Sequence, residues 1–116
     1  DQWQQALELF QEMQDNNIAP NSVTYNTAIS ACEKGGQWQL ALKLLQEMKE
    51  KNITCDNYTY SAAISACRKG GQCQQALELF QEMQDKKIAL DTITYSAAIS
   101  AYGKGGQCQQ ALGFFQ

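Results

Sequence analysis

Side chains that commonly perform chemistry are few in this chain. Histidine is absent, which removes the commonest general base and the commonest zinc ligand and excludes serine–histidine and cysteine–histidine catalysis within the chain. The five cysteines are odd in number and form no C-x-x-C pair: Cys32, Cys55, Cys67, Cys73 and Cys108. We therefore expect no metal site and no cofactor, and we interpret the cysteines as small buried or half-buried apolar residues.

Short polar side chains recur at an interval of 35 residues. One series carries an amide or a hydroxyl, at Asn26, Ser61 and Ser96. A second series carries an amide or a carboxylate, at Asn21, Asp56 and Asp91. An amide or hydroxyl donates to or accepts from one edge of a planar polar ligand, and a carboxylate accepts from an N–H group. These residue types favour recognition by hydrogen bonding over the making or breaking of bonds.

The same interval organises the whole chain. It separates the members of three further series: Met13, Met48 and Met83; Tyr25, Tyr60 and Tyr95; and the glycine pairs that begin at Gly35, Gly70 and Gly105. A fixed period of this length indicates a repeat architecture, in which each unit buries its apolar face only against its neighbours.

The second half of each unit is predicted to be a helix. Apolar residues recur there at steps of three and four, at Trp38, Ala41, Leu42, Leu45 and Met48. This spacing places them on one helical face. The remaining positions are filled with Gln, Glu and Lys, which are good helix formers.

The first half of each unit is also predicted to be a helix, although S-V-T-Y-N-T has the composition of a strand. Tyr25, Ile29 and Cys32 lie at i, i+4 and i+7, which is a helical spacing. A residue able to cap a helix precedes each segment, and a lysine and a glycine pair end it.

These elements predict an all-α fold, a right-handed α–α superhelix of 35-residue helix-turn-helix repeats. The predicted helices are Gln2–Asn16, Val23–Lys34, Gln37–Lys51, Tyr58–Lys69, Gln72–Lys86, Ile93–Lys104 and Gln107–Phe115. The units are 1–21, the second half of a repeat; 22–56 and 57–91, two complete repeats; and 92–116, a partial repeat. We expect one continuous solenoid that is a segment of a longer array.

The core is expected to contain the recurring aromatic, aliphatic and methionine positions. The tyrosine series shares its apolar face with Ile29, Ile64 and Ile99. The methionine series and the two tryptophans, Trp3 and Trp38, are assigned to the same core.

The motif of each unit resembles the pentatricopeptide repeat, which has a 35-residue period. The matching positions are Val23-Thr24-Tyr25-Asn26-Thr27, Ile29, Ala31, Lys34, Gly36, Ala41-Leu42, Leu44, Met48, Ile53 and Asp56. Ankyrin repeats have a shorter period and a T-P-L-H signature that is absent here, and tetratricopeptide repeats have a period one residue shorter.

The resemblance implies that the chain binds single-stranded RNA, one base per repeat, with the first helices lining a concave groove. In the family, the fifth and last residues of a repeat together recognise a base. By that pattern Asn26 with Asp56 is associated with uracil, and Ser61 with Asp91 with guanine. Ser96 alone suggests a purine, and Asn21 leaves its base open.

Two further series follow from the resemblance and the repeat. The second residues, which pack against neighbouring bases in the family, are Val23, Tyr58 and Ile93. Lys34, Lys69 and Lys104 recur once per unit, as phosphate contacts along an RNA strand would.

Each assignment has a structural alternative. Asp56 and Asp91 are good helix N-caps, and capping and base recognition are expected to need different orientations of one carboxylate. The lysines complement the negative end of a helix dipole without any ligand. Tyr58 either stacks on a base or packs between helices.

The charge balance bears on the RNA hypothesis. Nine Lys and Arg against twelve Asp and Glu give a net charge of −3, which argues against diffuse binding to nucleic acid or to an anionic membrane. The acids lie mainly on the second helices, at Glu8, Glu12, Glu47, Glu50, Glu78 and Glu82, whereas the recurring lysines lie on the first helices. The average charge therefore lowers the expected affinity and leaves the hypothesis standing.

The favoured function is a non-enzymatic, sequence-specific module that binds single-stranded RNA. By family resemblance it acts in a mitochondrion or chloroplast, in RNA processing, stability, editing or translation. The alternative is a helical-repeat scaffold that binds a protein or peptide in the same groove, and protein partners through flanking domains fit either function. No membrane association is expected, since no apolar stretch approaches the roughly 20 residues of a membrane span.

Overall fold

The computed structural model describes residues 2–103, and every regular element in this part of the chain is a helix. The helices are α1 (Gln2–Asp15), α2 (Ser22–Lys34), α3 (Trp38–Glu50), α4 (Asn57–Lys69), α5 (Cys73–Asp85) and α6 (Thr92–Gly103). Each end differs by at most one residue from the sequence prediction. The predicted helix Gln107–Phe115 lies outside the described residues.

The first helices begin at the residues expected to cap them. The side chains of Asn21, Asp56 and Asp91 accept hydrogen bonds from the backbone N–H three residues later, at 3.0, 3.1 and 2.9 Å. In each case the threonine at that position accepts in return from the N–H of the capping residue. This reciprocal arrangement is a capping box, and it fixes where α2, α4 and α6 start.

The two glycines after each first helix have different tasks. Gly36 and Gly71 have φ of +69° and +76°, the left-handed conformation that costs glycine least. Gly35 has an ordinary φ, but a Cβ there would overlap the indole of Trp3, and a Cβ at Gly70 would overlap Trp38. The first glycine of each pair therefore leaves room for a tryptophan ring to pack on the backbone, and the second adopts the left-handed conformation of the turn.

The second helices end without glycine. Asn17, Asn52 and Lys87 have φ of 62°, 59° and 59°, and the isoleucine after each donates its N–H to the methionine carbonyl five residues earlier, at 2.8–3.0 Å. This is the hydrogen bond of a Schellman motif. Asparagine tolerates the left-handed conformation better than lysine does.

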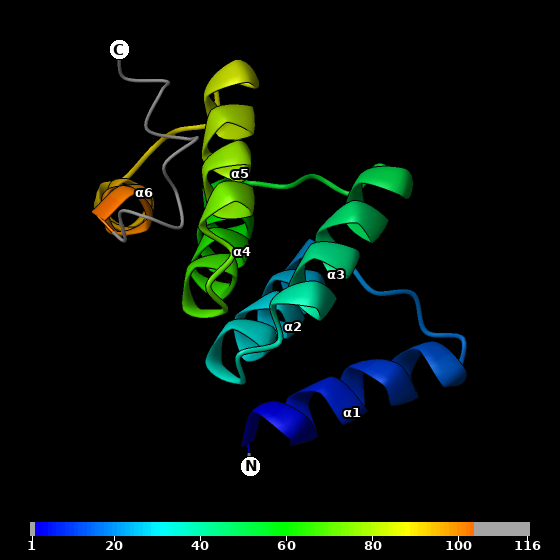
Figure 1. Cartoon of the computed structure of the whole chain (residues 1–116). Helices are drawn as coiled ribbons and strands as arrows, with labels where there is room; N and C mark the ends of the chain where they lie inside the picture. Colours follow the sequence, from blue (N-terminus) through cyan, green and yellow to red (C-terminus); the bar gives the residue numbers. More distant parts are fainter. Residues whose placement is uncertain (1, 104–116) are drawn as a thin grey trace.

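The helices form two layers of a superhelix (Figure 1). The first helices pack on one another, α2 on α4 and α4 on α6, whereas each second helix packs against first helices. Long side chains join neighbouring second helices, as in the ion pair between Lys49 of α3 and Glu82 of α5. This closer packing of the first helices makes α2, α4 and α6 the inner layer.

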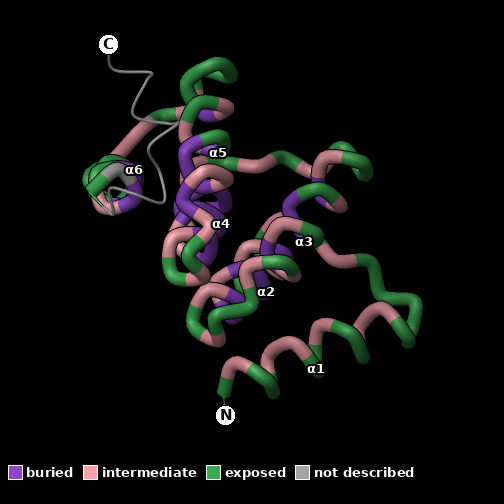
Figure 2. The backbone as a smooth tube through the Cα atoms, viewed as in Figure 1, coloured by how far each residue is buried: buried purple, intermediate pink, exposed green. Residues whose placement is uncertain are grey.

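The core lies between the layers and follows the repeat (Figure 2). Tyr25, Tyr60, Ile29 and Ile64 are fully buried, as predicted, and so are Met48 and Met83. The free cysteines Cys32 and Cys67 are buried and Cys55 is half-buried, as expected of small apolar residues. Cys73 is also buried, but it is disulfide-bonded, which the sequence interpretation did not expect. Burial raises the pKa of the Cys32 and Cys67 thiols to about 11 and about 12. Cys108 lies outside the described residues.

The assignment of Tyr95 and Ile99 to the core is wrong for the described part of the chain. These residues are 48% and 67% exposed. Their counterparts Tyr25 and Tyr60 contact the second helix of the same repeat, through Glu47 of α3 and Glu82 of α5. The corresponding segment for Tyr95 and Ile99 is 107–115, which lies outside the described residues. Trp3 and Trp38 are half-buried and cover the glycine turns, and Met13 on α1 is half-buried because no described helix precedes α1.

Within residues 2–103, no helix is long and apolar enough to cross a membrane. The same residues contain no cluster of three or more cysteine, aspartate or glutamate side chains that could hold a metal ion.

Candidate functional site

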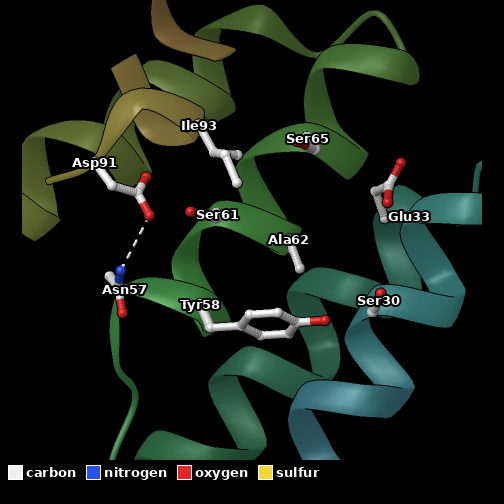
Figure 3. Close-up of a pocket in the computed structure, with 9 residues that line it drawn as sticks. All are labelled: Ser30, Glu33, Asn57, Tyr58, Ser61, Ala62, Ser65, Asp91 and Ile93. Carbon is white, nitrogen blue, oxygen red and sulfur yellow. Dashed lines mark hydrogen bonds between the residues drawn. The ribbon is translucent and has the colours of Figure 1, made fainter. Parts of the chain in front are cut away.

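A pocket of about 240 Å³ opens on the inner layer between α2, α4 and the start of α6 (Figure 3). Its lining residues are Ser30, Glu33, Asn57, Tyr58, Ser61, Ala62, Ser65, Asp91 and Ile93. Four of them were predicted as site residues from the sequence: Tyr58, Ser61, Asp91 and Ile93. The fold therefore brings a fifth residue, a last residue and two second residues from adjacent repeats into one pocket.

The Ser61 hydroxyl is an unpaired polar group in the lining of this pocket. Ser61 is 8% exposed, and its Oγ is buried without a hydrogen-bond partner in the structure. Buried hydroxyls are normally paired because leaving one unpaired costs about 1–3 kcal/mol. Figure 3 shows this hydroxyl between the ring of Tyr58 and the side chain of Ile93.

Asp91 serves two partners with its two carboxylate oxygens. Oδ1 accepts from the N–H of Thr94 at 2.9 Å and caps α6, whereas Oδ2 accepts from Nδ2 of Asn57 at 3.2 Å. The backbone hydrogen bond from Thr94 is the main cause that lowers the pKa of Asp91, with further hydrogen bonds from the Thr94 hydroxyl and Asn57. Asp91 therefore stays ionised at neutral pH. Capping of α6 by the backbone N–H of Thr94 thus engages Oδ1, while Oδ2 faces Asn57 of α4.

Asn26 and Asp56 meet at Thr59. The Thr59 hydroxyl lies 2.5 Å from Oδ1 of Asn26 and 3.0 Å from Oδ1 of Asp56. With its carbonyl oxygen engaged, the Asn26 amide presents Nδ2 as a free donor, and Asp56 presents Oδ2 as a free acceptor. A donor and an acceptor therefore lie side by side at the junction of the two repeats.

The second residues form a row of exposed apolar side chains. Val23, Tyr58 and Ile93 are 67%, 54% and 62% exposed. The Tyr58 ring extends from α4 across the pocket towards Ser30 of α2 (Figure 3). The three side chains stand at the same position of successive repeats.

Asn21 and Ser96, in the first and last units, each stand without the other residue of a predicted base-reading pair within the described residues. Asn21 is exposed and caps α2. Ser96 is exposed and lines a separate pocket against α4.

The predicted row of three equivalent lysines is not uniform. Lys69 makes an ion pair with Glu33 of the preceding repeat, so its charge is partly neutralised. Lys34 is exposed and lines a hollow with Trp3 and Ser30. Lys104 lies outside the described residues.

Sequence reasoning missed three residues of the site: Asn57, Thr59 and Glu33. Each contacts a residue 33 to 36 positions away, across the junction between two first helices. The period itself was the available signal, because residues one unit apart face each other across the junction between repeats.

The chain is similar to known proteins throughout. The PPR repeat family matches residues 1–34, 20–69 and 63–104, and the PPR repeat matches residues 93–116. The crystal structure of the pentatricopeptide repeat protein PPR10 from maize is 32% identical and superposes with a TM-score of 0.80, over 95% of this chain and 16% of that one. PPR10 in complex with an 18-nt psaJ RNA element gives 32% identity and a TM-score of 0.79, over 96% of this chain and 16% of that one.

The chain thus spans less than a fifth of the length of PPR10. No curated protein matches this chain significantly. The family match nevertheless runs along the chain and agrees with the two-layered superhelix of helix pairs. The chain belongs to the PPR repeat family.

Proposed function

We propose that this chain binds single-stranded RNA in a sequence-specific manner, with one base per repeat, along the groove lined by α2, α4 and α6. The observation that carries the proposal is the pocket that Ser61 and Asp91 line together with Tyr58 and Ile93. The similarity to PPR10, which has been solved in complex with an RNA element, supports the same function.

The pocket offers what an unpaired base requires. Tyr58 and Ile93 provide two apolar surfaces, and stacking of a base on an aromatic ring contributes about 1–3 kcal/mol. Ser61 and Asp91 provide hydrogen-bonding groups at the edge of the space between these surfaces. Sequence-specific RNA recognition usually targets unstacked bases in this way.

The hydrogen-bonding groups suggest which bases fit. Asn26 offers a donor and Asp56 an acceptor, which match an adjacent carbonyl and N–H on the edge of uracil. Asp91 accepts from the N–H groups of guanine, and the Ser61 hydroxyl donates to or accepts from the same edge. The proposed target of the two complete units is therefore U-G, with a purine at the unit of Ser96 and no assignment at Asn21.

The proposed role is non-enzymatic. The chain would hold an RNA strand while processing, stabilisation, editing or translation acts on it, in a mitochondrion or chloroplast. Two complete base sites give little affinity by themselves, so tight binding requires a longer array of such repeats.

The test uses an array that contains these repeats and fluorescently labelled single-stranded RNAs. We expect RNA with U-G in the matching register to bind more tightly than its scrambled counterpart, by about 10-fold or more, since one good pair of hydrogen bonds discriminates by about 1–3 kcal/mol. Equal affinity for the two RNAs would contradict base recognition. Tight binding of a peptide without RNA binding would favour the protein scaffold instead.

A single substitution tests the base assignment. In Ser61→Asn, the longer side chain is expected to reach the Thr94 hydroxyl as Asn26 reaches Thr59, and to present its amide donor to the base. The preference of that unit should then move from guanine towards uracil. Binding of four RNAs that differ only at this base measures the change, and an unaltered preference would refute the assignment.

A further inference from the structure

A second pocket, of about 410 Å³, lies on the inner layer between α4 and α6. Its lining residues are Ser65, Arg68, Thr92, Ile93, Ser96, Ala97 and Ser100. All seven stand 35 residues after members of the first pocket, so the two pockets are the same place in successive repeats.

The two pockets differ in charge at one position. Glu33 lines the first pocket, and its counterpart one repeat later, in the second pocket, is Arg68. Glu33 reaches across the junction and pairs with Lys69. The Lys69 side chain is 45% accessible, but its ammonium group is paired with Glu33 in the lining of the first pocket.

Arg68 has no such partner within residues 2–103. It is the one arginine of the chain, its Nε is buried without a hydrogen bond, and it takes part in no ion pair among the described residues. The lining of its pocket contains no acidic residue. By contrast, Lys49, Lys51, Lys69 and Lys86 each pair with a glutamate.

We propose that Arg68 binds a phosphate of the RNA backbone in the pocket between α4 and α6, in place of Lys69, whose charge Glu33 neutralises. This inference rests on the proposed RNA-binding function and adds to it a cation that stands outside the recurring lysine series. The ligand is the phosphodiester of the strand whose base lies near Ser96.

The chemistry of the pocket favours a phosphate over a base. A guanidinium forms two parallel hydrogen bonds to phosphate oxygens. The hydroxyls of Ser65 and Ser100 in the same pocket are further donors for these oxygens. The fold leaves the hydrogen-bonding capacity of Arg68 partly unused, since its Nε is buried without a partner.

Glu33 acts in the opposite sense. Its carboxylate repels a strand in the first pocket and holds Lys69 away from phosphate. The affinity of the groove is therefore expected to rise when Glu33 is neutralised.

The test measures binding of a labelled single-stranded RNA containing U-G to the 116-residue chain at several salt concentrations. Three variants each remove one positive charge: Arg68→Gln, Lys69→Gln, and Lys43→Gln as a matched control on the exposed face of α3. Glu33→Gln removes the opposing carboxylate. Circular dichroism verifies the fold of each variant.

We expect Arg68→Gln to weaken binding about 10-fold at low salt and to reduce the salt slope by about 0.7, which is the value for one phosphate of a single strand. Lys43→Gln should change both quantities little. Lys69→Gln should weaken binding less than Arg68→Gln does, and only because it leaves the Glu33 carboxylate unpaired. Glu33→Gln should strengthen binding several-fold. The inference is overturned if Lys69→Gln weakens binding as much as Arg68→Gln, or if Arg68→Gln resembles Lys43→Gln while the original chain still prefers U-G. If neither the chain at low salt nor an array that contains its repeats binds RNA, the proposed function and this inference are overturned together.

Discussion

Glu82 on α5 is surrounded by three donors from three places in the fold. It accepts from the Tyr60 hydroxyl of α4, from Lys49 of α3 at 2.5 Å and from Lys86 at 3.3 Å. Burial alone raises the pKa of this carboxyl, but the hydrogen bonds from Lys49, Tyr60 and Lys86 and the charge of Lys49 outweigh it and hold the pKa below its usual value. One side chain thus joins two successive repeats on the outer side of the superhelix.

This arrangement predicts a pH-dependent contribution to stability. A carboxyl whose pKa is lower in the folded state stabilises the fold above its unfolded pKa, near 4.3, and the stabilisation is lost as the pH falls through the folded pKa. Glu82→Gln should therefore lower the free energy of unfolding by about 1–2 kcal/mol at neutral pH, and by progressively less below about pH 4.

Urea unfolding across this pH range measures the effect. Glu47→Gln is the matched control, because Glu47 also accepts from a tyrosine and lies beside a lysine. The position equivalent to Lys49, one repeat earlier, is the uncharged Gln14, so the counterpart of the Lys49–Glu82 ion pair has no positive charge. The control should lose less stability. An equal loss for Glu82→Gln at acid and neutral pH would contradict the ionic contribution.

Among the elements, the second helices differ in how they end. The left-handed residue after the helix is asparagine for α1 and α3 but Lys87 for α5. A lysine there carries a Cβ penalty that local hydrogen bonding of asparagine lessens. The turn after α5 is therefore more strained than its two counterparts, although all three keep the same hydrogen bond from isoleucine to methionine.

Lys87→Asn should relieve this strain. We expect the free energy of unfolding to rise by about 0.5–1 kcal/mol, the magnitude typical of substitutions compatible with a left-handed residue. The reverse change at the equivalent position, Asn52→Lys, should lower it by a similar amount. Thermal and urea unfolding of both variants provide the measurement, and opposite signs would show that charge rather than conformation dominates at these turns.

At the scale of the whole molecule, burial increases from α1 inwards. α1 contains no buried residue, and Leu9 is 65% exposed, whereas its counterparts Leu44 and Leu79 are 5% and 7% exposed. The counterparts belong to the core, and their helices α3 and α5 each pack against a first helix of the same repeat, whereas no described first helix precedes α1. In a solenoid, stability is the sum of such contacts between neighbours.

A first helix added before α1 should therefore stabilise the chain. The addition is a copy of residues 22–36 joined to Gln2, which keeps the 35-residue register. It is expected to bury Leu9 and, at about 25 cal/mol per Å² of apolar surface, to raise the free energy of unfolding by a few kcal/mol. Urea unfolding and hydrogen exchange on α1 measure the gain. A control that replaces the residues equivalent to Tyr25 and Ile29 in the copy by serine should show little gain, and equal gains would contradict the packing argument.

Much of this protein follows from its sequence alone. Apolar spacing, capping residues and glycine turns are local, so they placed all six described helices to within one residue, and the 35-residue period indicated that these helices stack. The predicted residues Tyr58, Ser61, Asp91 and Ile93 line one pocket because the period carries them to the same junction. The base each unit recognises stays a prediction.

Only the tertiary structure decided what depends on the curvature of the stack. The pairing of Glu33 with Lys69, the hydrogen bond from Thr59 to Asn26 and the unpartnered Arg68 all lie where one repeat meets the next. Repeats with nearly the same sequence therefore differ in charge and exposure. The physical reason is that a helix is specified by neighbours within four residues, whereas a groove is specified by side chains more than 30 residues apart whose distance depends on how the helices pack.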